Sequence, residues 1–281
     1  MIKRRDLAGL VGLGATAAAV GALSTSASAQ TAHETTWERI MRTKKLRTGG
    51  VTTGAPWTMK DVATGEWNGH FYHIAKTMAE DMDVELEVVE TQWGNAIMDL
   101  QANKIDIMFG MNLTPTRALA VDFTDTVYDS ALVVIARHGF EPVTWEDMNN
   151  PDCRIAVDVG TAHDHIVSRL CPNATISRLR SLDEASMTLR SGRADVQCLF
   201  WMGALRAVKR DEQMGHVVVP QPQFGATSNA CVRREQDKTF RDYANAWISY
   251  SRNMGLIRSL VIESLEAVDL TTADIPEGIS L

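Results

Sequence analysis

Two hydrophobic patterns alternate along this chain of 281 residues. Segments with an apolar residue at every third or fourth position indicate amphipathic helices, and short, almost wholly apolar segments indicate buried strands. Such alternation favours parallel βαβ units with helices on both faces of a sheet. The pattern restarts after ALVVIARHG (131–139), which indicates two α/β units. The predicted helices are 36–45, 70–82, 95–104, 162–170, 181–192 and 237–265, and the predicted strands are 45–54, 84–90, 104–110, 153–160, 174–179 and 194–201.

Three of the predicted strands end in segments rich in glycine and threonine. These segments are TTGAPW (52–57), GMNLTPTR (110–117) and VGTAHD (159–164). In open α/β sheets, ligands bind beyond the carboxyl ends of the strands, where free backbone N–H groups can receive an anion. We therefore expect the three segments at the rim of a binding site.

Within the second segment, LTPTR (113–117) has the sequence of a helix start. Thr114 suits the N-cap, and Pro115 suits the first helical position. Arg117 then falls in the first turn, where the helix dipole disfavours a cation. Either Arg117 is an ordinary solvated side chain, or an anion from outside the chain balances its charge.

The first 29 residues have the features of a secretory signal. A basic start is followed by an apolar stretch rich in glycine and alanine, and small residues precede the expected cleavage after Ala29. Arg4 and Arg5 make this segment similar to a twin-arginine export signal, and the general pathway stays open. No later segment is apolar for long enough to span a bilayer. We therefore expect the mature chain to be exported and soluble.

The charge and the cysteines argue against several classes of function. The formal net charge is −7 and no basic run is present, which argues against nucleic acid or an anionic membrane as a partner. The four cysteines, at positions 153, 171, 198 and 231, contain no CxxC pair, so we expect no zinc site. The sequence also lacks a nucleophile elbow and a paired-carboxylate signature, and we expect no cofactor.

The order of these motifs resembles the periplasmic solute-binding proteins of polar amino-acid ABC transporters (bacterial extracellular solute-binding protein family 3). The resemblance covers about residues 44–266. It rests on VTTGAPWTMKDVATGEWNG, WGNAIMDLQANKIDI and GMNLTPTRALAVDFTDTVY, and then on IAVDVGTAHD, SGRADVQCLFW and YANAWISYSRNMGLI. It implies a two-lobed periplasmic-binding-protein fold, in which each lobe is a mostly parallel sheet flanked by helices and a two-strand hinge joins the lobes. Lobe 1 would comprise residues 30–134 and 222–281, and lobe 2 would comprise residues 135–221.

The resemblance also implies a function. The chain would be the periplasmic binding component of an ABC importer, a monomer that closes about its hinge over a small carboxylate-bearing solute and then meets a membrane permease. Arg117 matches the family's arginine that grips the ligand carboxylate through two parallel hydrogen bonds. Thr161 matches the residue of lobe 2 that meets the same carboxylate. The other matching positions are Gly110, Asn112 and Thr114 at a strand end, and Trp57 and Trp93, which either stack on the ligand or pack in the core.

The sequence departs from the family where an aspartate usually holds the ligand's α-ammonium. That position is Phe200, followed by Trp201. Burying an ammonium without a counter-charge costs several kcal/mol. Either another acid replaces it, with Asp158 the first candidate and Asp164 the second, or the ligand lacks a primary ammonium. An amino acid, a betaine and an aromatic carboxylate therefore stay open, because aromatic faces attract both quaternary ammoniums and rings.

A second departure concerns histidines. The family's Gly-Phe-Asp-x-Asp is here GHFYH (69–73), which we interpret as substitutions on a helix surface. An enzyme is one rival function, because the same fold hosts periplasmic dehydratases of cyclic acids. Its base would be His70, His73, His163 or His165, although a histidine in a helix is usually solvated. A ligand sensor that signals to a receptor is the other rival.

The last expectation concerns a disulfide bond. Cys153 and Cys171 each precede a strand, and these strands would be neighbours in lobe 2, starting at the same end of the sheet. We therefore predict a disulfide between them. Cys198 and Cys231 lie within strands, where a small buried hydrophobic side chain is expected.

Overall fold

The computed structural model describes residues 34–277 and residue 279. The predicted signal segment and its cleavage site after Ala29 lie outside the described residues. In the part of the chain that is described, no helix has the length and apolar character needed to cross a membrane.

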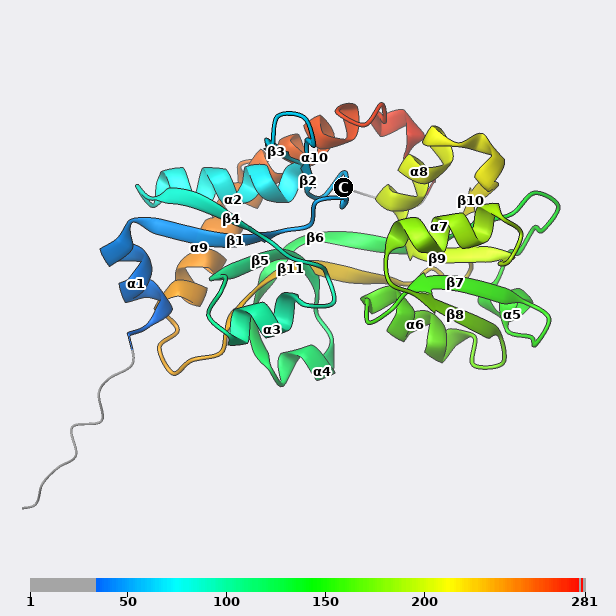
Figure 1. Cartoon of the computed structure of the whole chain (residues 1–281), viewed down its shortest axis with the longest axis horizontal. Coiled ribbons are helices and arrows are strands. Elements are labelled where there is room, and N and C mark those ends of the chain that lie inside the picture. The colour runs from blue at the N-terminus through cyan, green and yellow to red at the C-terminus, as the bar shows by residue number, and fades with distance from the viewer. Residues whose placement is uncertain (1–33, 278, 280–281) are drawn as a thin grey trace, which may run out of the picture. The chain divides into compact units, whose positions relative to one another are not determined.

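Helices and strands alternate along the chain, as the hydrophobic pattern predicts (Figure 1). The first half contains α1 (Thr36–Thr43), β1 (Lys45–Gly50), β2 (Met59–Lys60), β3 (Trp67–Asn68), α2 (His70–Asp81), β4 (Glu85–Glu90), α3 (Ala96–Gln101), β5 (Ile107–Asn112), α4 (Pro115–Ala118) and β6 (Val121–Ala136). The second half contains α5 (Trp145–Met148), β7 (Arg154–Asp158), α6 (Ala162–Leu170), β8 (Thr175–Leu179), α7 (Leu182–Arg190), β9 (Val196–Phe200), α8 (Trp201–Arg210), η1 (Glu212–Met214), β10 (His216–Val218), β11 (Gly225–Arg233), α9 (Thr239–Asn253), α10 (Leu256–Glu266) and η2 (Thr272–Asp274).

The predicted helices and strands are confirmed, with three differences. The last predicted helix divides into α9 and α10 at Gly255, whose φ of 75° is left-handed and favours glycine. The strand predicted over 194–201 ends at Phe200, so that Trp201 begins α8, a helix that the pattern did not predict. Third, the pattern did not predict β2, β3, β6, β10 or α5, and of β11 it gave only a strand around Cys231.

Side-chain caps explain where several helices begin. The hydroxyl of the residue before each helix accepts a hydrogen bond from a backbone N–H of the first turn, which satisfies a donor that has no partner within the helix. Such a cap begins α1, α4, α5, α6 and α7, and the capping residues are Thr35, Thr114, Thr144, Thr161 and Ser181.

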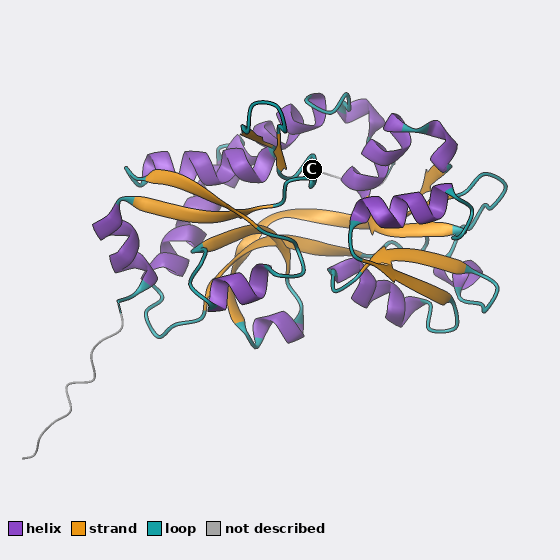
Figure 2. Cartoon of the chain, viewed as in Figure 1, coloured by secondary structure: helices purple, strands orange, loops and turns teal. Residues whose placement is uncertain are grey.

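Nine of the described strands form one sheet in the order β4-β1-β5-β11-β6-β9-β7-β8, with β10 paired to β6, and β2 and β3 form a separate antiparallel pair (Figure 2). Strand β1 is parallel to β4 and β5, and β7 is parallel to β8 and β9. Strands β6 and β11 are antiparallel to each other and lie between these two parallel groups. The sheet is therefore mostly parallel within each lobe, and two antiparallel strands join the lobes.

Strand β6 changes partners along its length. From Val121 to Ala131 it pairs with β11, and from Leu132 to Ala136 it pairs with β9. Its burial changes at the same point, since every residue from Ala131 to Ala136 is buried while several earlier ones are partly exposed. One continuous strand thus belongs to both lobes.

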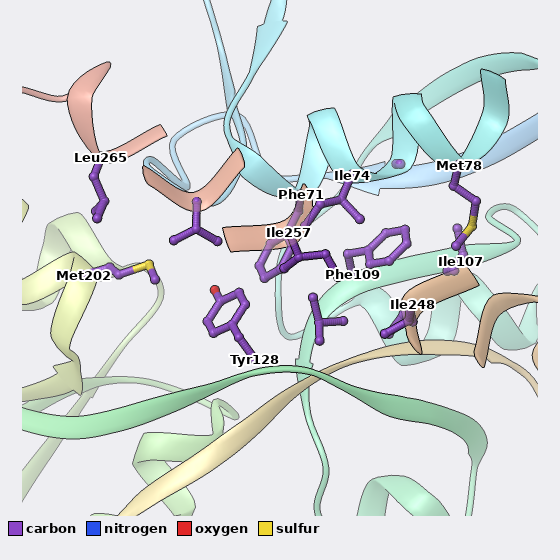
Figure 3. Close-up of a cluster of buried hydrophobic side chains, with 14 of the residues drawn as sticks. Phe71, Ile74, Met78, Ile107, Phe109, Tyr128, Met202, Ile248, Ile257 and Leu265 are labelled. Carbon is purple, nitrogen blue, oxygen red and sulfur yellow. The ribbon is translucent and has the colours of Figure 1, made fainter. Parts of the chain in front are cut away.

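Alternate residues of the central strands pack on opposite faces of the sheet. In β5, Ile107 and Phe109 join the core formed with α2, while Met108 and Met111 join the one formed with α3. Figure 3 shows the first of these cores, in which side chains of α2, β5, β6, α9 and α10 meet, with Met202 of α8 close to Leu265 of α10. Burial of each such side chain is worth about 1.5–3 kcal/mol.

The predicted disulfide is wrong. Cys153 and Cys171 are both buried and both free. Strand β8 begins only at Thr175, whose N–H bonds to the Cys153 carbonyl, so Cys171 is not at the start of that strand. Instead it ends α6, and its Sγ donates to the Trp145 carbonyl at 3.5 Å. Cys198 and Cys231 are free and fully buried within strands, as expected.

Candidate functional site

A cleft of about 280 Å³ opens beyond the carboxyl ends of the central strands, a volume that suits a small solute. Residues of all three segments rich in glycine and threonine line it. The predicted site residues that line it are Trp57, Trp93, Gly110, Asn112, Arg117, Asp158, Thr161 and Phe200. The cleft therefore collects residues that lie far apart in the sequence.

Arg117 is positioned by the loop after β5. The Thr114 hydroxyl caps α4 and accepts a hydrogen bond from the Arg117 backbone N–H at 3.2 Å. The guanidinium donates from Nη1 to the Asn112 carbonyl at 3.1 Å and from Nη2 to the Gly160 carbonyl at 3.2 Å. Asn112 ends β5 and Gly160 follows β7, so the side chain reaches from one group of parallel strands to the other.

No described residue supplies a counter-charge to Arg117. Within residues 34–277 and 279, its guanidinium contacts carbonyl groups and no carboxylate lies within ion-pair distance of it. Burial lowers the pKa of Arg117, but a guanidinium stays protonated at neutral pH. Buried charges in proteins are normally paired. Arg117 is thus a cation that lines the cleft and has no carboxylate partner within residues 34–277 and 279.

Aromatic side chains form much of the wall. The rings of Trp57 and Trp93 meet edge to face, with centroids 6.4 Å apart and planes at 86°. Phe71 stacks on Tyr128 at 5.8 Å. Gly110 has a φ of 82°, and a Cβ there would lie 2.3 Å from the Phe71 ring. Glycine at this position therefore lets the strand pass directly beneath the aromatic wall.

His70 is buried, so its interpretation as a helix-surface residue was wrong. Its Nδ1 lies 2.8 Å from Ser264 Oγ and its Nε2 lies 2.9 Å from Tyr128 Oη. Ser264 Oγ donates to the Val261 carbonyl, so it accepts from Nδ1–H, and Nε2 then accepts the Tyr128 proton. Burial lowers the pKa of His70 to about 3, so it is neutral. Tyr128, which lines the cleft, is held in place from α10 through this chain of contacts.

Asp158 and His163 form a buried pair on the other wall. Asp158 ends β7 and His163 lies in the first turn of α6, where its Nε2 contacts Asp158 Oδ1. Burial raises the pKa of Asp158, but the charge and hydrogen bond of His163 lower it more, so the net pKa is below its usual value. The Phe200 ring meets the His163 ring edge-on at 5.5 Å. The Thr161 hydroxyl donates to the Asp158 carbonyl at 2.8 Å, which fixes the turn.

Three candidates from the sequence do not line the cleft. Thr114 caps α4, and Trp201 is fully buried in the core. Asp164 accepts from Arg178 at 2.9 Å and from the Gly160 N–H at 3.0 Å, so both of its oxygens are engaged by the protein.

Other lining residues were not expected as site residues. They include Phe71, Tyr128, Ser130, Arg180 and Ser228, and His163 was expected to be solvated. Position alone could have indicated His163, because it lies in the third strand-end segment. In the described part of the chain, no group of three or more His, Cys, Asp or Glu residues could hold a metal ion.

Comparison with known proteins agrees with this geometry. Residues 46–261 match the bacterial extracellular solute-binding proteins, family 3. The ABC transporter arginine-binding protein 1 of Escherichia coli is 26% identical over 186 residues, which are 65% of this chain and 75% of that protein. The cyclohexadienyl dehydratase of Pseudomonas aeruginosa is 24% identical over 256 residues, which are 87% of this chain and 91% of that enzyme.

A solved structure extends the likeness to the fold. The ancestral amino acid-binding protein AncCDT-1, a precursor of cyclohexadienyl dehydratase, has a TM-score of 0.72 at 27% identity, covering 80% of this chain and 97% of that one. Both groups of parallel strands and the two strands that join them lie within the family match. The chain therefore belongs to the bacterial extracellular solute-binding proteins of family 3.

Proposed function

We propose that this chain is the solute-binding component of an ABC importer and that its cleft binds a small carboxylate-bearing solute, an amino acid or a related acid. The observation that carries the proposal is Arg117, a cation that faces the cleft with no carboxylate partner among the described residues. A planar guanidinium binds a carboxylate through two parallel hydrogen bonds. Relatives named as arginine-binding proteins support the amino-acid class.

Residues around Arg117 would complete the site. The Thr161 hydroxyl and the backbone at the start of α6 would meet the same carboxylate from the opposite wall. Gly110 and Asn112 would contribute strand-end groups, and Trp57 and Trp93 would cover the apolar part of the solute.

Binding would close the cleft about a hinge. Lobe 1 would comprise residues 30–134 and 222–281, and lobe 2 residues 135–221, with β6 and β11 as the hinge strands. The contact of Arg117 with the Gly160 carbonyl supports this, because one side chain already joins both walls. A solute carboxylate that bridges the walls would bury the charge pair and exclude water, which strengthens the interaction.

The closed form would then present its surface to a membrane permease. Export to the periplasm, with cleavage after Ala29, and action as a monomer belong to the same proposal. Membership of the solute-binding family supports these assignments.

Thermal melts test the proposal. The purified chain would be screened against amino acids, betaines and aromatic carboxylates beside Arg117→Ala. Arg258→Ala is the matched control, since Arg258 is an exposed arginine on α10. A solute at a hundred times its Kd should stabilise the wild type and the control by about 2.7 kcal/mol, and Arg117→Ala should lose this shift. The absence of any shift, or an equal shift in Arg117→Ala, would contradict the proposal.

An enzyme is the second candidate. The Asp158–His163 pair in the cleft favours it, because an imidazole that a carboxylate orients is a common general base. A cyclohexadienyl dehydratase is also among the relatives. Mass spectrometry separates the two functions. A binding protein returns its solute unchanged after long incubation, whereas an enzyme returns a product, and Asp158→Asn or His163→Gln should abolish that product.

A further inference from the structure

The charged groups that line the cleft are unevenly balanced. Two arginines line it, Arg117 after β5 and Arg180 after β8. Asp158 is the one carboxylate among the lining residues that the structure describes. Neither arginine forms an ion pair with an acid in the described residues.

Asp158 is already engaged by the protein. Its side chain is about one-tenth exposed, and Oδ1 contacts Nε2 of His163, whose side chain is equally buried. The Phe200 ring packs edge-on against that imidazole and closes the pair on one side. A cationic group of the solute would have to approach a carboxylate that an N–H donor already stabilises. The lining therefore offers an anion two guanidiniums that have no carboxylate partner among the described residues, and it offers a cation one carboxylate, whose Oδ1 is already engaged by His163.

Asp164, the neighbouring acid, gives no alternative. Its two carboxylate oxygens accept from Arg178 and from the Gly160 N–H, and it does not line the cleft. The remaining polar side chains of the lining are hydroxyls, amides and the His163 imidazole, none of which carries a negative charge. An α-ammonium buried among them would lack a full counter-charge, which proteins avoid.

We propose that the solute is a small organic acid with no ammonium group on the carbon next to its carboxylate. It is the deaminated counterpart of an amino acid rather than the amino acid itself. This inference rests on the proposed function, in which Arg117 receives the carboxylate. Arg180, which also lines the cleft, would favour a second acidic or polar group on the same solute.

Matched pairs of solutes test the inference by calorimetric titration of the full chain. The pairs are L-phenylalanine with 3-phenylpropanoate, L-glutamate with glutarate, and L-arginine with 5-guanidinopentanoate, and glycine betaine is added as a seventh solute. In the pair that binds most tightly, the deaminated acid should bind at least tenfold more tightly than its amino acid. Tighter binding of the amino acid, or of glycine betaine above every deaminated acid, would overturn the inference and leave the proposed function standing.

Failure of the proposed function has a different signature. In that case no solute of the panel binds, or Arg117→Ala binds them as well as the wild type does, and the inference falls with it. A dependence on Arg117 combined with a preference for the amino acid contradicts the inference alone.

Substitutions of His163 test whether its contact with Asp158 is the reason that the cleft disfavours a cation. His163→Leu removes the donor from Asp158 and exposes a free carboxylate to the cleft, so the ratio of affinities should shift at least tenfold towards the amino acid. His165→Leu, at an exposed position of the same helix, should leave the ratio unchanged. His163→Gln keeps a donor for Asp158 and should retain the wild-type ratio of affinities. It provides a second test at this position if His163→Leu does not fold. An unchanged ratio in a folded His163→Leu would show that this pair does not exclude the cation, and the inference would be wrong.

Discussion

Arginines at the two ends of the central strands differ in their partners. At the amino end of β5, Asp106 accepts from the Arg47 side chain at 2.7 Å and also contacts Arg39, and its side chain is fully buried. At the amino end of β9, Asp195 accepts from Arg154 and Arg137 at 2.8 Å each. Each aspartate also binds a backbone N–H of the neighbouring parallel strand.

At the carboxyl end, the side-chain partners of Arg117 among the described residues are two carbonyl groups. The same residue type is therefore used in two ways. Where the protein supplies the carboxylate, the arginine ties one strand to the next; where it does not, the guanidinium is left for a solute. Among the arginines at these strand ends, a carboxylate from the described residues thus distinguishes the structural arginines from Arg117.

The largest effect should come from breaking the cluster of Arg39 and Arg47 around Asp106, whose side chain is fully buried. Asp106→Ala leaves Arg39 and Arg47 without a counter-charge and should lower the free energy of unfolding by about 3–5 kcal/mol. Urea denaturation at pH 7 measures this value. Asp152→Ala, at an exposed aspartate, should change it by no more than about 0.5 kcal/mol. If Asp106→Ala lowers the free energy of unfolding by less than about 1 kcal/mol, the cluster contributes no more than an exposed ion pair does, and the prediction is wrong.

His70, which contacts the lining residue Tyr128, is a buried group that the protein satisfies by itself. Its pKa of about 3 lies below the value of about 6.5 in an unfolded chain. The unfolded state thus binds a proton first, so the stability that neutral His70 contributes is complete above about pH 6.5 and is lost as the pH falls towards 3. The loss should be of the order of 4 kcal/mol. His70→Gln should flatten this pH dependence of unfolding, and an equally steep profile in the variant would assign the dependence to other groups.

The cluster of Asp195 with Arg137 and Arg154 should contribute less stability than the cluster around Asp106. The side chains of Arg137 and Arg154 are 44% and 42% exposed, so water can solvate them when Asp195 is removed. Asp195→Ala should therefore cost about 1–2 kcal/mol at pH 7. Hydrogen bonds from Arg154 hold the pKa of Asp195 well below its usual range, so its contribution is present above about pH 4 and lost as the pH falls further. The difference from the wild type should shrink at acid pH, and a constant difference would contradict the ionic origin.

The smallest effect should come from Thr114. It was expected to contact the ligand, but it caps α4 and does not line the cleft. Thr114→Ala should cost about 1 kcal/mol of stability and weaken solute binding less than tenfold, while Thr114→Ser keeps the cap and the affinity. Calorimetric titration of both variants measures this, and a loss as large as that of Arg117→Ala would restore Thr114 as a contact residue.

Local patterns predicted much of the fold. The predicted helices and parallel strands carry their own periodicity, and the rule that ligands bind beyond carboxyl ends located the three segments that line the cleft. Strand β6 carries no single period, because it changes partners at Leu132 and is buried on both faces from there on. The burial pattern of such a strand depends on its neighbours in the sheet, so the sequence of the strand alone does not predict it.

Side-chain direction was less predictable. Trp201 lies next to Phe200 in sequence, but the strand ends between them and the helix start directs Trp201 into the core. His70 occupies a helix start with no local sign of burial, and its partners Tyr128 and Ser264 are distant in sequence. Cys171 belongs to a helix end rather than to the strand start assumed for the disulfide. Each case depends on a contact that only the tertiary fold creates.

The central claim is that Arg117 is held for a solute carboxylate. The most direct test measures both the Kd of the best solute from the panel and the free energy of unfolding for Arg117→Ala. The account predicts a loss of affinity of at least a hundredfold, about 2.7 kcal/mol, with a loss of stability below about 1 kcal/mol. A variant that binds within tenfold of the wild type but loses as much stability as Asp106→Ala would show that Arg117 is a structural arginine, and the account would be wrong.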